Sequence, residues 1–179
     1  MSKTDILQCL KELDGKDGVS LILCGAKSAY MKHASSFVEK NAHMYYAQLQ
    51  FTEDLECCVK EDCIVKIAIF VEGQKAESTY HRLPELGKNL TAVLSGDSWI
   101  DISNKTVSKG AALKAIQMRL NIRKTQCMAF GDYLNDYNLL LCCTESYEME
   151  NAHPELKKIA KYITASNDEQ GVMKVLRTL

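Results

Sequence analysis

Polar side chains follow abruptly on a short apolar run in the segment AFGDYLND, residues 129–136. The apolar residues predict a buried strand, and Asp132, Asn135 and Asp136 fall in the loop at its carboxyl end. Ligands of open α/β sheets gather at such strand ends, where Gly131 lets a ligand or a backbone approach closely. Because Mg²⁺ prefers one or two carboxylates together with water and substrate phosphate, these residues suffice for part of a magnesium site. The alternative is a structural loop in which Asp132 begins a turn and Asn135 or Asp136 caps the next helix.

A second candidate is a lysine at the start of a predicted helix. Ser108 can cap a helix that runs to about Leu120, which places Lys109 in the first turn beside Gly110. A helix N-terminus offers free amides and a positive dipole, and with the added charge of the lysine it makes a good receptor for phosphate. A cation there is otherwise unfavourable by about 0.3–1 kcal/mol. Taken alone, Lys109 is equally consistent with a solvated surface lysine.

The composition is that of a globular protein without an excess of either charge. The chain has 179 residues, of which 46% are hydrophobic, and a formal net charge of -1. Since acids and bases are interspersed, we expect neither nucleic acid nor a membrane surface as a partner. The N-terminal segment has helical apolar spacing, which predicts neither a signal peptide nor a membrane span. Eight cysteines without a C-x-x-C pair indicate free thiols in a reducing cytoplasm, with no zinc site.

The first hundred residues predict an α+β domain. Its expected helices cover residues 4–13, 28–40, 54–59 and much of 74–86. Its expected strands cover residues 19–24, 44–51 and 63–71, and the segment LTAVLSGDSWIDIS predicts a two-stranded hairpin.

From residue 106 onward the pattern changes to an alternation of helices and strands. Strands are expected at QCMAF and SYEM, and helices over residues 108–120, 135–143, 154–160 and the C-terminal residues that follow the capping segment SNDEQ. Leu113, Ile116 and Leu120 predict a buried stripe on the first of these helices. We therefore predict the α/β class with two domains, residues 1–105 and residues 106–179.

Four segments carry a resemblance to a known family. In their order and spacing, VSKGAAL, AFGDYLND, NAHPELKKIAKYIT and SNDEQGV resemble the C-terminal half of Cof-type phosphatases of the haloacid dehalogenase superfamily. That family binds magnesium through a strand-end G-D-x-x-N-D motif and contacts the phosphoryl group through the lysine of a K-G pair. The resemblance implies that Asp132 and Asp136 are magnesium ligands and that Lys109 contacts the phosphate. The implied supporting residues are Asn135, Gly131 and Gly110.

The resemblance also implies a fold. Residues 1–105 are similar to the large α/β cap of these phosphatases, and residues 106–179 to the C-terminal part of their Rossmann-like core without its first strands. The segment EMENA departs from the pattern, because the family usually has A-M-G-N-A at this place. Glu148 and Glu150 are thus expected to bring extra acid near the site.

The nucleophile of the family is not found in the sequence. In the family, an aspartate of a D-x-D pair attacks phosphorus and forms a covalent intermediate. No two aspartates of the chain are two positions apart, and Asp14 and Asp17 in DGKDG are turn residues. We expect a truncated fragment that lacks the nucleophile half. In such a fragment QCMAF presents an unpaired edge beside an uncovered apolar face, so residues 106–179 are expected to be loosely ordered or completed by a second copy.

The function implied is that of a Mg²⁺-dependent phosphomonoester hydrolase for small phosphorylated metabolites such as sugar phosphates, here inactive through truncation. The alternative is a noncatalytic module, derived from the cap, that binds a ligand or a partner. The substrate is not specified by any motif. Four aromatic residues are candidates for lining a pocket, namely Tyr45, Tyr46, Tyr80 and Trp99. The alternative is packing in a core, which is more common for aromatic residues of strands.

Overall fold

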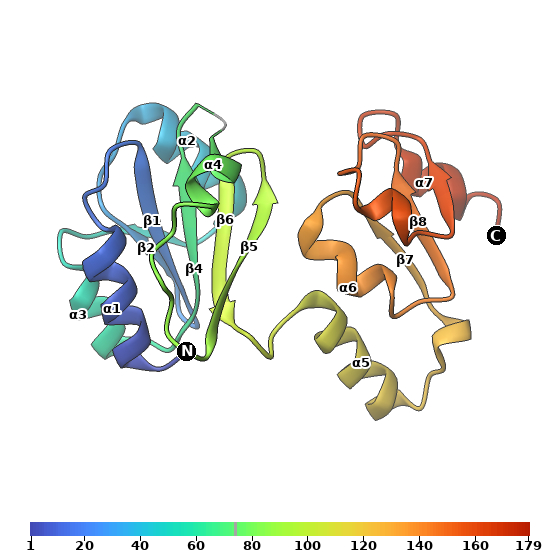
Figure 1. Ribbon diagram of the computed structural model, residues 1–179, viewed down its shortest axis with the longest axis horizontal. Helices are drawn as coiled ribbons and strands as arrows, with labels where there is room; N and C mark the ends of the chain where they lie inside the picture. Colours follow the sequence, from blue (N-terminus) through green and yellow to red (C-terminus); the bar gives the residue numbers. More distant parts are fainter. Residues whose placement is uncertain (74) are drawn as a thin grey trace. The chain divides into compact units, whose positions relative to one another are not determined.

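The computed structural model describes residues 1–73 and 75–179. It divides into two compact units, Met1–Lys105 and Thr106–Leu179, which are called unit 1 and unit 2 below (Figure 1). Each unit combines a β-sheet with helices, which confirms the predicted α/β class. The expected helix start at Gln74 lies outside the described residues.

Unit 1 contains a six-stranded sheet with the order β3-β2-β1-β4-β6-β5. Neighbouring strands are antiparallel, except that β2 and β3 are parallel. The hairpin predicted from LTAVLSGDSWIDIS is confirmed by the pairing of β5 with β6. The strands are β1 (Val19–Gly25), β2 (Ala29–Met31), β3 (Leu49–Phe51), β4 (Ile64–Val71), β5 (Leu90–Gly96) and β6 (Trp99–Asn104).

Four helices accompany this sheet, namely α1 (Lys3–Leu13), α2 (Ser36–Tyr45), α3 (Leu55–Glu61) and α4 (Ala76–Tyr80). Side chains of Ser2, Ser35 and Asp54 cap the first three by accepting a hydrogen bond from a backbone amide of the first turn. Helix α2 buries Val38 and Ala42 in a cluster with residues of β1 and β4. Helices α1 and α3 pack against each other, side by side in Figure 1.

The helix predicted over residues 28–40 is wrong in its first half. Ala29, Tyr30 and Met31 form β2, which pairs with β1, and all three are buried. Strand pairing in the core outweighed the helical spacing of this segment. The helix instead begins at Ser36, behind the cap of Ser35, and takes in the first residues of the segment expected to be extended.

Unit 2 contains a three-stranded parallel sheet with the order β7-β8-β9. The strands are β7 (Met128–Gly131), β8 (Glu145–Met149) and β9 (Tyr162–Thr164), and the helices are α5 (Lys109–Leu120), α6 (Tyr137–Leu140) and α7 (Gly171–Leu176). The helix expected over residues 135–143 is shortened to α6 after a 3₁₀ turn, and the one over 154–160 is a 3₁₀ turn at Leu156–Lys158. Strand β9 had no sequence prediction.

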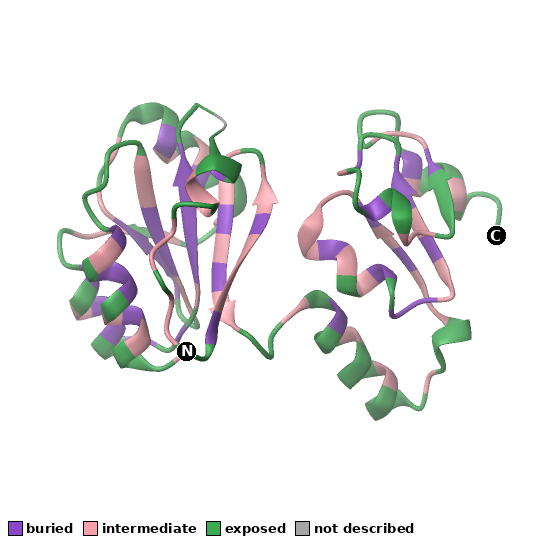
Figure 2. Cartoon of the chain, in the orientation of Figure 1, coloured by how far each residue is buried: buried purple, intermediate pink, exposed green. Residues whose placement is uncertain are grey.

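The buried stripe predicted for α5 is wrong. Ile116 is 52% exposed and Leu120 59% exposed, and much of α5 is coloured as exposed in Figure 2. Strand β7 lies at one edge of its sheet. Within the described part of unit 2, α5 packs on the α6 region and leaves this apolar face open.

None of the helices in the described ranges is long and apolar enough to span a membrane. All eight cysteines carry free thiols.

A buried aspartate stabilises the loop between β1 and β2 through hydrogen bonds. Asp62 accepts hydrogen bonds from the backbone N–H of Lys27 at 2.9 Å, the hydroxyl of Tyr30 at 3.1 Å and the backbone N–H of Cys63 at 2.7 Å. Gly25 leaves room for this carboxylate, since an added Cβ would lie 2.1 Å from Asp62 Oδ2. Burial alone would raise the pKa of Asp62, but the hydrogen bonds hold this pKa below its ordinary value.

We predict that Asp62→Ala lowers the melting temperature by several degrees, because it leaves these donors unpaired. Since the pKa of Asp62 is lower in the folded than in the unfolded chain, its stabilisation is present above the unfolded value of about 3.9 and is lost as pH falls through the folded value. Circular-dichroism melts across this pH range should therefore show the wild type and the variant converging in acid. The exposed turn residue Asp17, changed to alanine, is the control, and an equal loss in both variants would contradict the role of Asp62.

Candidate functional site

The lysine predicted at the start of α5 lies where the sequence places it. Ser108 Oγ accepts a hydrogen bond from the backbone N–H of Ala111 at 3.0 Å, so Ser108 is the N-cap and Lys109 the first helical residue. Lys109 Nζ donates to Asp136 Oδ1, which lies just beyond β7. The Lys109 side chain is 50% exposed, whereas that of Asp136 is buried. The structure thus brings together two of the residues selected from the sequence.

Asp136 organises the loop that follows β7. Its Oδ2 accepts a hydrogen bond from the backbone N–H of Asp132 at 3.2 Å, while its Oδ1 accepts from Lys109. Gly131 allows this arrangement, since a Cβ there would lie 2.6 Å from Asp136 Cβ. Asp136 makes no side-chain cap of α6, so the capping role considered for it is wrong. Both carboxylate oxygens instead join the start of α5 to the end of β7.

Asp132 lies at the carboxyl end of β7 and is contacted from two other loops. Its Oδ2 accepts a hydrogen bond from Asn167 Nδ2 at 2.8 Å, and its carbonyl oxygen accepts from the backbone N–H of His153 at 2.8 Å. Asn151 Oδ1 in turn accepts from the backbone N–H of Asn167 at 3.1 Å. The loops after all three parallel strands therefore converge on Asp132, as the topology of a parallel sheet favours.

Asn167, Asn151 and His153 were not selected from the sequence. The segment SNDEQ was interpreted as the cap of the last helix, but α7 begins after Gln170 (φ 57°) without a side-chain cap. Asn167 could have been found as a polar residue in the loop after a parallel strand. That strand, β9, was not predicted, because it has only three residues and two of them are exposed.

The two supporting glycines and Asn135 have distinct surroundings. A Cβ on Gly110 would lie 2.4 Å from the carbonyl oxygen of Asn138, so this glycine lets α5 approach the α6 region closely. Gly131 makes room for Asp136, as described above. Asn135 is partly exposed in the 3₁₀ turn Leu134–Asp136.

Glu148 is a fully buried carboxyl group in β8, paired in register with Gly131. Its Oε2 has no hydrogen-bond partner among the described residues. Burial raises the pKa of Glu148 above its ordinary value, and the charge of Lys157 only opposes this rise. Burial thus disfavours the charged form of Glu148 relative to that of an exposed glutamate. Glu150, by contrast, is exposed.

The donor atoms fit a magnesium ion that is shared with a ligand better than a closed metal site. No group of three or more His, Cys, Asp or Glu side chains in the described part of the chain is placed to hold a metal. The partly exposed Asp132 offers a hard carboxylate, while Asp136 is already engaged by Lys109. Mg²⁺ needs only one or two carboxylates when water and phosphate complete its shell, whereas structural zinc needs four protein ligands.

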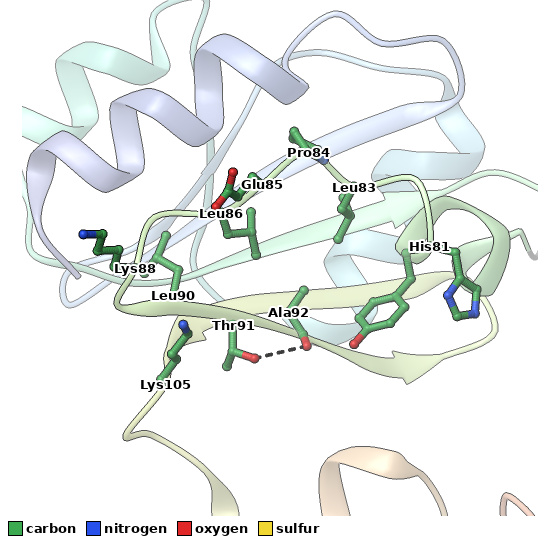
Figure 3. A pocket seen from close by; sticks show the side chains of 11 residues that line it. His81, Leu83, Pro84, Glu85, Leu86, Lys88, Leu90, Thr91, Ala92 and Lys105 are labelled. Atoms are coloured by element: carbon green, nitrogen blue, oxygen red, sulfur yellow. Dashed lines mark hydrogen bonds between the residues drawn. The ribbon is translucent and has the colours of Figure 1, made fainter.

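A separate cavity of about 510 Å³ lies in unit 1, where the segment after α4 runs over β5 (Figure 3). Tyr80, one of the aromatic residues noted in the sequence, lines it together with His81. Lys88 and Lys105 lie toward one end of this cavity. No residue selected for phosphate or metal binding lines it.

Comparison with known proteins gives matches along nearly the whole chain. Residues 1–176 match the family of haloacid dehalogenase-like hydrolases. The 5-amino-6-(5-phospho-D-ribitylamino)uracil phosphatase YbjI of Escherichia coli is 28% identical over 178 residues, which are 98% of this chain and 65% of the relative. Phosphatase YwpJ of Bacillus subtilis is 36% identical over 106 residues, 59% of this chain and 37% of the relative. The chain thus spans less than two thirds of the length of these relatives.

A solved structure matches both units. The crystal structure of SMU.1108c from Streptococcus mutans has a TM-score of 0.87 and 27% sequence identity. The match covers 99% of this chain and 68% of that chain.

We predict that Asp136→Ala destabilises unit 2 by about 1–3 kcal/mol, because it leaves the partly buried backbone N–H of Asp132 without its acceptor. Hydrogen exchange of the β7 amides and urea unfolding measure this loss. Asp136→Asn, which keeps one carbonyl acceptor, should lose less. The control is Asp168→Ala, at an exposed turn position, and an equal effect of Asp136→Ala and Asp168→Ala would show that Asp136 does not hold the loop.

Proposed function

The chain belongs to the haloacid dehalogenase-like hydrolases, and from this premise we propose that unit 2 supplies the phosphate- and magnesium-binding part of a phosphomonoester hydrolase. Unit 1 is then the cap that selects the substrate. The observation that carries the proposal is the joining of Lys109, Asp136 and Asp132 at the carboxyl end of β7. The substrate class is small phosphorylated metabolites such as sugar phosphates; the name of the Escherichia coli relative describes one phosphate ester of this size.

Lys109 is the phosphate-binding residue of this proposal. Its half-exposed side chain belongs to the first residue of α5, where the first backbone amides and the helix dipole also favour an anion. The buried carboxylate of Asp136 accepts a hydrogen bond from Lys109 Nζ and so restricts the conformations of the lysine side chain. A fixed cation of this kind offsets the negative charge of a transferred phosphoryl group.

Asp132 is the residue that would hold Mg²⁺, with its carboxylate oriented by Asn167. Bound magnesium would supply positive charge that neutralises phosphoryl oxygens. The role of Asp136 as a second ligand stays a prediction, since its two oxygens accept hydrogen bonds from Lys109 and Asp132. The free thiols fit a reducing compartment, and we place the protein in the cytoplasm on this ground.

The attacking group is proposed to come from outside residues 1–179. No two aspartates of the chain have the D-x-D spacing, so the chain is proposed to be a fragment that binds phosphate without hydrolysing its esters. A second candidate is a noncatalytic ligand- or partner-binding module, which is favoured by the six-stranded sheet and the cavities of unit 1. In that case unit 2 does not bind phosphate.

We predict that the purified chain gives no turnover of p-nitrophenyl phosphate with Mg²⁺, but binds orthophosphate in a calorimetric titration. Lys109→Ala should weaken this binding by roughly tenfold through the loss of one charge-assisted hydrogen bond. Asp132→Ala should abolish its dependence on Mg²⁺. Lys114→Ala, at an exposed position of the same helix, is the matched control.

These outcomes separate the proposals. Turnover by the chain alone would refute the absence of a nucleophile. Equal phosphate binding by Lys109→Ala and Lys114→Ala would refute the phosphate site and favour the noncatalytic module.

We also propose that a second copy of the chain covers the open face of unit 2. Leu113, Ile116 and Leu120 share one side of α5, and the last two are more than half exposed. The open edge of β7 offers unpaired backbone groups in the same unit. We propose neither nucleic acid nor an anionic membrane as a partner, since a net charge of -1 provides no overall attraction for either.

We predict that the mean mass measured by light scattering rises with concentration toward that of a dimer. Ile116→Lys should shift the equilibrium to the monomer, because a charged side chain would have to be buried in the contact. Val65→Lys, at an exposed apolar position of unit 1, is the control and should leave it unchanged. A strictly monomeric wild type with full exchange protection of residues 127–130 would contradict self-association.

A further inference from the structure

We propose that unit 1 carries a binding pocket for an uncharged small molecule with a flat ring, between α2 and the turn of the β5–β6 hairpin. The cavity has a volume of about 530 Å³, within the range of roughly 300–1,000 Å³ that is typical of small-molecule sites. Its walls combine aromatic rings with a few polar groups, as such sites usually do. All of its lining residues belong to unit 1, so the proposal goes beyond the phosphoryl chemistry assigned to unit 2 and does not depend on it.

One wall of the pocket is a single side of α2. Phe37, Asn41 and Tyr45 follow at intervals of four residues and therefore lie above one another on the helix. Phe37 is 60% exposed and Tyr45 64% exposed, although both are large aromatic side chains. Exposed rings that gather around a concavity, rather than lying scattered over the surface, indicate a binding surface.

The floor of the pocket is aromatic and rigid. Trp99 of β6 packs edge-on against Phe70 of β4, with ring centroids 4.9 Å apart, and against Tyr45, with centroids 5.2 Å apart. Phe70 also contacts Phe37 at 6.1 Å. Each ring thus packs against another ring, while Phe37 and Tyr45 keep accessible surface. A flat ligand ring can stack there without any rearrangement of the wall.

The polar groups of the pocket suit the edge of a neutral ring. Asn41 Nδ2 donates to the carbonyl oxygen of Phe37 at 2.8 Å, which fixes the amide and leaves its oxygen as an acceptor. Ser95 and Ser98 bring hydroxyl groups from the hairpin. Asp97 is the one charged residue among the described residues that line the cavity, and a carboxylate without a lining lysine or arginine disfavours an anion. Its oxygens are hydrogen-bond acceptors, which suit a ring edge that carries N–H donors. The ligand class is therefore an uncharged ring with hydrogen-bonding edges, such as a pyrimidine base.

The single tryptophan of the chain makes the pocket directly measurable, because Trp99 is part of its floor. Uridine, a neutral pyrimidine nucleoside, is the probe, and ribitol is the comparison without a ring. Titration of the full chain with uridine should change the emission of Trp99 to saturation, whereas ribitol should leave it unchanged. Phe37→Ala should weaken uridine binding by roughly tenfold, the loss of one stacking surface.

Phe37 is the suitable position because its ring contacts Phe70 rather than Trp99, so the fluorophore keeps its own neighbours. The matched control is Met44→Ala, which removes a 66% exposed side chain from the same helix outside the pocket lining. It should bind uridine as the wild type does. A response that does not saturate, an equal response to ribitol, or equal affinities of Phe37→Ala and Met44→Ala would each overturn the proposal.

Discussion

The buried carboxylate of Asp136 is the constraint on which the candidate site depends. A carboxylate removed from water is stable only when its oxygens are paired, and here Lys109 and the backbone N–H of Asp132 supply the partners. These two contacts come from different elements, the start of α5 and the end of β7. The need to pair one charge therefore fixes Lys109, the cation proposed to bind phosphate, beside Asp132, the acid proposed to hold the metal. Because the Lys109 side chain remains half exposed while that of Asp136 is buried, the lysine is the member of the pair that an anion in solution can reach.

The parallel sheet of unit 2 explains why the remaining contacts arise there. Parallel strands end at the same edge, so the loops after β7, β8 and β9 meet although they are distant in sequence. Asn151 and Asn167 link the second and third loops to Asp132 through hydrogen bonds. A sheet of this kind is normally buried on both faces and flanked by further strands. Because the sheet of unit 2 has three strands, β7 has an open edge and the apolar side of α5 is exposed.

Local signals predicted the parts of the site that are local in origin. The cap at Ser108 and the polar loop after an apolar strand were correctly placed, since each rests on neighbouring residues. The hydrogen bond from Lys109 to Asp136 was not predicted, because the two residues are 27 positions apart in the sequence. Strand β2 was mistaken for helix, since its pairing with β1 is a tertiary effect. The stripe on α5 has the spacing of a buried face, but spacing does not show which element would cover it.

The two proposed binding surfaces rest on different physics. Lys109 attracts an anion through charge, which salt weakens because the side chain is half exposed. The rings of Phe37, Tyr45 and Trp99 act through stacking and apolar burial, which salt does not screen. The cavity in unit 1 that carries these rings has no lining cation among its described residues, so a free phosphate gains nothing there. Recognition of a ring and recognition of a phosphoryl group are thus assigned to separate sets of residues, each suited to one chemistry.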